Sequence, residues 1–203
     1  MPHESPSLPA FVSGPTFPFR GRLEARSLEP AAEEPARDGD DPETCKVCGG
    51  ADSEYIWVSD RWRVRASDGH VALPAVMVLE SRSHLDLGDL PNLLAAELGV
   101  MTVRLERAIR SLPGVARVHV NRWGDNSAHL HVWFFARPAG QLQLRGSVLP
   151  MWNELLPPIP AETMRHNIAL VAAWLADFGG RSVVDPPRIE WQSLSFEEPP
   201  QSG

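Results

Sequence analysis

Two neighbouring segments with an alternating pattern constrain the fold of this chain more than any other feature. Polar and apolar residues alternate in Val115–Trp123 and again in His129–Ala136, which is typical of strands with one buried face. The sequence Gly124-Asp125-Asn126 between them favours a tight turn. Strands joined by a tight turn pair antiparallel, because a parallel pair needs a long crossover. The chain is therefore expected to contain an antiparallel sheet.

The pattern elsewhere predicts the other elements of an α+β domain. Three further strands are expected before these two, at 55–58, 62–65 and 71–79. A long helix begins near Pro91, with apolar residues three or four positions apart, and a final helix covers 161–178. This order predicts a mostly antiparallel sheet, with a long helix after the third strand and a C-terminal helix.

Proline and acidic residues mark the expected ends of the domain. Residues 1–43 hold eight of the twenty prolines and an acidic run, which predicts an N-terminal arm that is disordered or loosely docked. Its aromatic residues Phe11, Phe17 and Phe19 could dock on the domain. The patterned body at 44–180 is the predicted domain, and 181–203 is a predicted C-terminal tail.

Charge and hydropathy exclude several classes of function. Nineteen Lys and Arg against 26 Asp and Glu give a net charge of -7, whereas a protein that binds nucleic-acid polymers needs a basic stripe. No apolar run approaches the roughly 18 residues of a membrane span. The first residues lack the pattern of a signal peptide. We therefore expect a cytoplasmic protein without a nucleic-acid polymer or a membrane as partner, although a single phosphate group remains a possible ligand.

Two histidines lie two positions apart in the second alternating segment. The period of two places His129, His131 and Trp133 on one face of a strand. Two neighbouring imidazoles can share a phosphate, ligate a metal, or act as nucleophile and helper. The alternative interpretation is a pair of structural histidines on a partly exposed face.

Two cysteines form a Cys-x-x-Cys pair, Cys45 and Cys48, which is followed by Gly49-Gly50. Two thiolates at this spacing fit one tetrahedral zinc ion, and the glycines permit a tight knuckle. Two cysteines are too few for a disulfide scaffold. Since there is no second pair, the other zinc ligands would have to be histidines or carboxylates. Two unrelated surface thiols are the alternative interpretation.

The layout around these motifs resembles the histidine-triad (HIT) superfamily, which includes the galactose-1-phosphate uridylyltransferases. The family signature is His-φ-His-φ-His-φ-φ, with φ apolar, after a loop of Gly, Asn, Gln and Ser. Here Gly124–Ala128 precedes His129–Phe135. The segment Val76–His84, the long helix and the strand with Asn121 agree with the family's element order. The resemblance covers about 44–137.

The resemblance implies the roles of the site residues. His131, the middle histidine of the motif, would be the nucleophile that forms a covalent nucleotidyl-histidine. The substrate would be a nucleotide or a phosphorylated small molecule, and the implied substrate-binding residues are Asn121, Asn126, Ser127 and Trp133. Zinc-containing members imply a closed, structural zinc site with four ligands, here Cys45, Cys48, His84 and His129. The family also implies a homodimer.

The chain departs from the family motif at Trp133, which replaces the third histidine. An indole donates one hydrogen bond but cannot exchange a proton, and the uridylyltransferases have Gln at this position. Three functions therefore stay open: a zinc-stabilised hydrolase or nucleotidyltransferase that uses His131, a catalytically degenerate nucleotide- or protein-binding module, and a zinc-dependent enzyme. The third requires His129 to face the substrate and leave a zinc position open.

Overall fold

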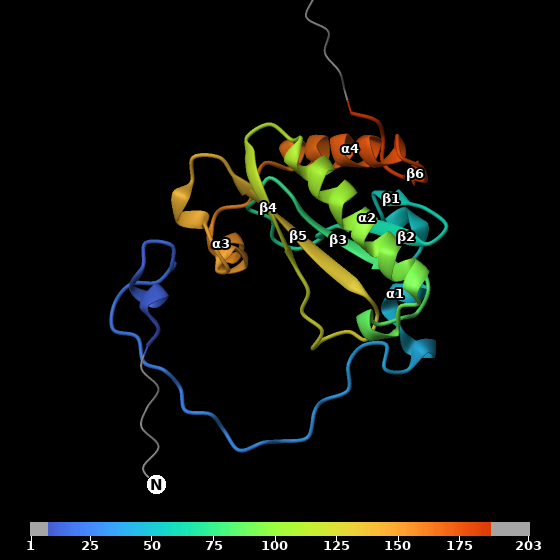
Figure 1. The fold of residues 1–203 in the computed structure, drawn as a ribbon. Coiled ribbons are helices and arrows are strands. Elements are labelled where there is room, and N and C mark those ends of the chain that lie inside the picture. Colours follow the sequence, from blue (N-terminus) through green and yellow to red (C-terminus); the bar gives the residue numbers. More distant parts are fainter. Residues whose placement is uncertain (1–7, 188–203) are drawn as a thin grey trace, which may run out of the picture.

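A six-stranded sheet forms the centre of the computed structural model, which describes residues 8–187 (Figure 1). Its strands are β1 Trp57–Val58, β2 Trp62–Ala66, β3 Val76–Ser81, β4 Val115–Asn121, β5 His131–Pro138 and β6 Arg181–Ser182. Their spatial order is β4-β5-β3-β2-β1-β6, and all neighbouring strands pair antiparallel. The predicted α+β fold with a mostly antiparallel sheet is confirmed.

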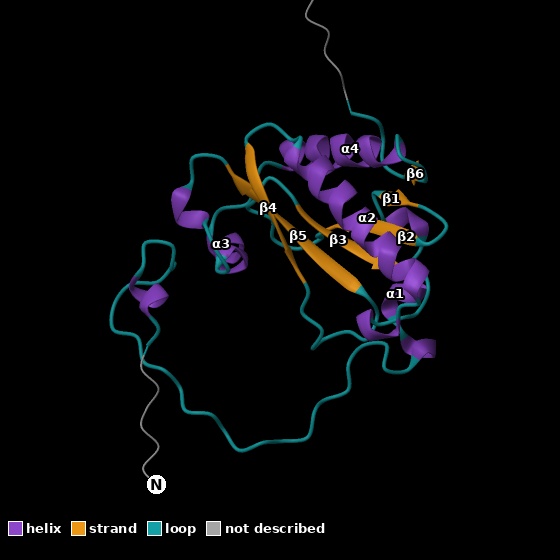
Figure 2. Ribbon diagram, in the orientation of Figure 1, coloured by secondary structure: helices purple, strands orange, loops and turns teal. Residues whose placement is uncertain are grey.

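Two long helices, α2 (Asn92–Arg110) and α4 (Ala161–Ala176), pack on one face of the sheet (Figure 2). The main core lies between them and the alternate β5 residues Val132, Phe134 and Ala136. Burial of these apolar side chains is the main source of stability in such a layer. The long helix after the third strand and the C-terminal helix are thus both present.

The opposite face of the sheet carries the other alternate residues of β5, which are His131, Trp133 and Phe135. Antiparallel pairing puts Glu80 beside His131, and puts Val78 and Asn121 on either side of Trp133. The short helix α3 (Leu149–Leu155) covers part of this face through a second apolar cluster around Phe135. Chemistry-bearing residues therefore share the face that the long helices leave uncovered.

Several boundaries differ from the sequence prediction; strand β4, for example, ends at Asn121 instead of Trp123. Strand β3 begins at Val76 instead of Val71, because residues 71–75 include Pro74 and pack against α3 through Asn153, which accepts a bond from the Ala72 N–H at 3.0 Å. Strand β5 begins at His131 instead of His129, because Leu130 donates its N–H to Leu85 outside the sheet. The last helix ends at Ala176.

Helices α1 (Lys46–Gly49) and α3 and strand β6 were not expected from the sequence. The chain from 181 was predicted as a tail, but Arg181–Ser182 pairs with β1 and Val183 donates its N–H to Ile56. Residues 1–7 of the predicted arm and 188–203 of the predicted tail lie outside the described residues.

The N-terminal arm contacts the domain at two places. Its aromatic cluster of Phe11, Phe17 and Phe19 lies near α3, where the Trp152 indole donates to the Thr16 carbonyl at 2.7 Å. Further along, Asp38 exchanges backbone hydrogen bonds with Asn126 and Ala128. Between these places the ribbon makes a wide open turn (Figure 1).

Within residues 8–187, no helix combines the length and apolar character needed to cross a lipid bilayer.

Candidate metal centre and candidate active-site cavity

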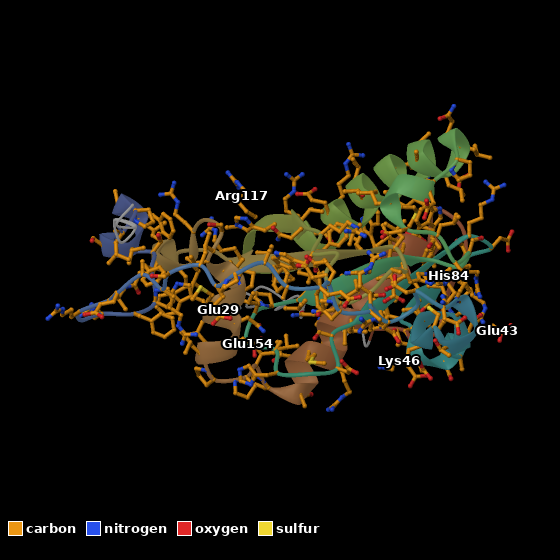
Figure 3. The ribbon with its side chains drawn as sticks, turned by 90° about the horizontal axis from the view of Figure 1, so that it is seen from below. Glu29, Glu43, Lys46, His84, Arg117 and Glu154 are labelled. Atoms are coloured by element: carbon orange, nitrogen blue, oxygen red, sulfur yellow. The ribbon has the colours of Figure 1, made fainter. Side chains whose placement is uncertain are left out.

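Four side chains from three separate segments meet at one end of the molecule. Cys45 and Cys48 belong to the knuckle at helix α1 (Lys46–Gly49), His84 follows β3, and His129 precedes β5. The ligand atoms of these four residues all lie within 4.8 Å of one another. Figure 3 labels His84 and, on the knuckle, Lys46. The tertiary structure thus brings together the four metal ligands that the family resemblance implied.

The spacing within this cluster fits a tetrahedral zinc ion. His129 Nδ1 lies 3.5 Å from both sulfur atoms, and His84 Nδ1 lies 3.3 Å from Cys48 Sγ. Zinc bonds of about 2.3 Å to sulfur and about 2.0–2.1 Å to nitrogen, at a tetrahedral angle, put the two atoms about 3.6 Å apart. The donor set and its geometry therefore suit zinc.

The protonation states in the cluster also favour a cation. The carbonyl of Ser81 lies 2.7 Å from His129 Nε2, which donates to it and leaves the Nδ1 lone pair facing the sulfurs. Burial lowers the pKa of His129 and keeps this ring neutral. Burial raises the pKa of Cys48, and the adjacent Cys45 raises it further. Two thiolates this close repel each other unless a cation lies between them.

His129 completes the cluster instead of facing the substrate side of the sheet. Its side chain is 0% exposed and in contact with both cysteines. Four protein ligands would close a tetrahedral site, whereas a catalytic zinc keeps one position open. The arrangement therefore does not favour the zinc-dependent enzyme considered above.

Two residues that the sequence analysis missed hold the knuckle in place. Arg63 donates to the carbonyls of Val47 at 2.7 Å and Gly50 at 3.2 Å, which ties the knuckle to strand β2. Gly39 of the arm is buried against the cluster with φ of +84°, where a Cβ would lie 3.2 Å from Cys45 Sγ. A side chain there would be strained and crowded.

A cavity of about 1300 Å³ lies beside His131, on the sheet face away from the long helices. Of the predicted substrate-binding residues, Asn126, Ser127 and Trp133 line it together with His131. Asn121 is in register with Trp133 on β4 but is not among the lining residues. Helix α3 borders the cavity through Met151, Asn153 and Glu154, the last of which is labelled in Figure 3.

Both ring nitrogens of His131 face carbonyl oxygens. Nδ1 lies 2.8 Å from the His129 carbonyl and Nε2 lies 2.7 Å from the Trp123 carbonyl. A carbonyl only accepts, and a neutral imidazole carries one N–H, so both contacts are hydrogen bonds only when the ring is doubly protonated. The Trp123 carbonyl therefore covers the nitrogen that faces away from the strand.

Trp133 forms a wall of the cavity. Its ring stacks on Phe135 with centroids 5.9 Å apart and an angle of 22° between the planes. The Arg65 guanidinium lies 5.9 Å from its centroid. Because the indole is held against Phe135, it leaves the cavity beside His131 open.

The chain before Ser127 is held by a cluster of charged residues. Arg37 of the arm donates to Asp86 at 2.9 Å and to the Gly124 carbonyl at 3.2 Å. Arg122 also pairs with Asp86. The arm thus fixes the loop whose Trp123 carbonyl contacts His131, which no sequence motif indicated.

No protein-family model matches the chain, and no curated protein sequence matches it. Several solved structures align with it, among them the following three. A hypothetical histidine triad nucleotide-binding protein from Sulfolobus tokodaii strain7 shares 14% identity, with a TM-score of 0.47 over 66% of this chain and 93% of that chain. A Hit-like protein involved in cell-cycle regulation from Bartonella henselae also shares 14% identity. Its TM-score is 0.48, and the alignment covers 69% of this chain and 99% of that chain. A Zn-bound histidine triad family protein from Mycobacterium smegmatis shares 17% identity. Its TM-score is 0.45, and the alignment covers 65% of this chain and 90% of that chain. All three are described as histidine-triad or Hit-like proteins, the family that the sequence motif resembles.

Proposed function

We propose that this protein binds a nucleotide or another phosphorylated small molecule beside His131 and acts on it as a hydrolase or nucleotidyltransferase. The observation that carries the proposal is the open cavity of about 1300 Å³ that His131 and Trp133 both line. Ligand cavities commonly measure about 300–1,000 Å³. Because Trp133 stacks on Phe135, there is room for a phosphate group next to the imidazole.

His131 would act as the nucleophile of a two-step transfer. Its Nδ1 donates to the His129 carbonyl, which leaves the lone pair on Nε2. As Nε2 forms a bond to phosphorus, the bond from phosphorus to the leaving oxygen breaks and that oxygen takes up a proton from solvent water. Water or an acceptor hydroxyl then displaces the histidine. The first step requires the Trp123 carbonyl to move away from Nε2.

Asn126 and Ser127 would donate hydrogen bonds to phosphate oxygens, since both line the same cavity as His131. Donors directed at a developing charge stabilise the transition state. Asn121 would act from the neighbouring strand through its register with Trp133.

Zinc would be held by Cys45, Cys48, His84 and His129 and would have a structural role. When bound, it would fasten the knuckle and the His84 turn to the residue that precedes β5, and so fix the strand that presents His131. Zinc-ligating thiols need a reducing environment, which supports a cytoplasmic location.

A second candidate is binding without turnover, as in a degenerate nucleotide- or protein-binding module. Two observations favour it: the Trp123 carbonyl lies 2.7 Å from His131 Nε2, and an indole occupies the place of the third histidine. A homodimer also remains a proposal. It is supported by strand β4 at the outer edge of the sheet, where Val120 is exposed.

The covalent intermediate tests the proposed activity. The protein is mixed with a panel of nucleotides, quenched with base to preserve phosphoramidates, and digested for mass spectrometry. We expect a nucleotidyl or phosphoryl adduct on His131, absent from His131→Ala and retained in His166→Ala, which alters an exposed histidine of α4. Unchanged turnover by His131→Ala would refute the nucleophile. Calorimetric binding without any adduct or turnover would favour the second candidate.

A further inference from the structure

The charges that line the cavity beside His131 limit how it could hold a phosphate. Five carboxylates line it, and they come from different elements: Asp38, Glu54, Asp68, Glu80 and Glu154. The lysine and arginine residues among the lining are Lys46 and Arg65. Lys46 and Arg65 are therefore the two lining side chains that carry a permanent positive charge and could attract an anionic ligand.

Lys46 is a weak candidate for this role. Its side chain is 86% exposed and lies 3.8 Å from Asp38. An exposed, flexible ammonium in water adds little binding energy and is already close to a carboxylate. Two other arginines near the site, Arg63 and Arg122, are bound to knuckle carbonyls and to Asp86 respectively.

Arg65 lines the cavity and forms an ion pair with a buried carboxylate. Its Nε donates to Glu80 Oε1 at 2.7 Å, and Glu80 is 1% exposed. The other oxygen of Glu80 accepts a hydrogen bond from the Tyr55 hydroxyl at 2.9 Å. Since both oxygens of Glu80 are engaged, the carboxylate fixes the orientation of the guanidinium.

The terminal amino groups of Arg65 remain available to a ligand. Among residues 8–187, the bond from Nε to Glu80 is the hydrogen bond that the Arg65 side chain makes. The side chain is 30% exposed and lines the cavity. A guanidinium with two free N–H groups on one edge suits the oxygen atoms of a phosphate.

The sheet register puts this guanidinium on the same face as His131. Glu80 pairs with His131, while Arg65 pairs with Val78, which itself pairs with Trp133. The guanidinium accordingly lies 5.9 Å from the Trp133 ring centroid. It is thus close to the position that the third histidine occupies in the family motif.

We propose that Arg65, oriented by Glu80, binds the phosphate group of the substrate and supplies the positive charge that Trp133 cannot. This inference rests on the proposed function, because it assumes a phosphorylated ligand beside His131. It makes Arg65 a substrate-binding residue and Glu80 its positioning residue.

Calorimetry on the full chain tests this proposal with nucleoside monophosphates, the matching nucleosides and inorganic phosphate as probes. We expect Arg65→Gln to weaken monophosphate binding at least tenfold and to leave nucleoside binding unchanged. Arg65→Lys should recover part of the loss. Arg117→Gln is the matched control, because it removes the same charge from an exposed position on β4.

Arg65→Gln leaves the buried Glu80 without its cation, so a second variant guards against misfolding. The double variant Arg65→Gln/Glu80→Gln replaces the ion pair with two amides and should show the same selective loss, with a wild-type melting profile. Equal monophosphate affinity in wild type and Arg65→Gln would overturn the role of Arg65 and leave the proposed function intact. Equal losses for nucleoside and nucleotide would show a merely structural role. Failure of the wild type to bind any probe would refute the proposed function as well.

Discussion

The Nε2 atom of His131 lies 2.7 Å from the carbonyl oxygen of Trp123. This contact is a hydrogen bond only when Nε2 carries a proton, whereas a nucleophilic imidazole needs a lone pair on the same atom. The loop after β4 therefore covers the reactive nitrogen in this structure. Arg37 of the N-terminal arm holds that loop through the next carbonyl, that of Gly124.

Replacing Arg37 should expose His131. The variant Arg37→Met removes the hydrogen bond to the Gly124 carbonyl together with the ion pair to Asp86, which would raise the open population of the loop by roughly two- to fivefold. We expect His131 to react correspondingly faster with diethyl pyrocarbonate, followed by peptide mass spectrometry. Arg26→Met, at an exposed position of the same arm, is the control. An unchanged rate would show that Arg37 does not hold the loop closed.

Removal of zinc should destabilise the domain. Elemental analysis is expected to find one zinc ion per chain, and Cys48→Ser or a chelator should remove it. Since bound metal contributes its binding free energy to folding, the apo protein should melt well below the holo protein. His166→Ala should keep both the zinc and the melting temperature. A chain without stoichiometric zinc would contradict the metal centre.

Gly39→Ala should weaken the same centre through backbone strain and crowding. A non-glycine residue at positive φ costs about 1–2 kcal/mol, and the added Cβ would lie 3.2 Å from Cys45 Sγ and His84 Cε1. Gly146→Ala is a matched control, because its φ is +90° and no atom lies within 4 Å of the added Cβ. We expect urea denaturation to show that Gly39→Ala loses more free energy of unfolding than Gly146→Ala, by about 1 kcal/mol or more. Equal losses would mean that the cluster tolerates the methyl group.

Trp133→His restores the third histidine of the family motif. A proton-transferring group at this position typically raises a rate about 10²–10⁴-fold, so turnover of a nucleotide substrate should increase by at least tenfold. Trp133→Phe, which keeps an aromatic ring but no titratable group, should show no such gain. If both variants lose activity to the same extent, the indole itself contributes to the site and proton transfer is not limiting.

The stability of the protein should depend on pH through His119. Burial and the nearby Arg137 lower the pKa of His119 below 6.5. The unfolded chain then binds the proton more readily than the folded protein. The contribution of neutral His119 to the free energy of unfolding is therefore complete above pH 6.5 and is lost as the pH falls toward the folded pKa. Urea unfolding from pH 5 to 8 measures the free energy of unfolding. Between neutral and acid pH this free energy should fall less for His119→Gln than for the wild type. Parallel curves would contradict this assignment.

The local pattern of the chain was sufficient for most of the fold. The alternation around Asn121 and His131 predicted two antiparallel strands, and the three- and four-residue spacing after Pro91 predicted helix α2. These periods are visible in the sequence because one face of each element is buried and the other is not. Strand β6 lacked such a signal, since two residues are too few to show a period.

The site was predictable only where residue types are distinctive. Cys45, Cys48, His84 and His129 are few and chemically specific, so the family resemblance could assign them to one cluster before any coordinates. The arginine and carboxylate that line the cavity, Arg65 and Glu80, look like ordinary surface residues in a sequence.

The sequence by itself determined the order of the elements, the Cys-x-x-Cys pair and the motif residues His129, His131 and Trp133, because these depend on neighbouring positions along the chain. Only the tertiary structure decided that His129 faces the cysteines instead of the substrate side, that the Trp123 carbonyl covers His131, and that Trp133 lies against Phe135 and leaves the cavity open. These outcomes depend on strand register and on contacts between distant segments, which local periodicity does not encode.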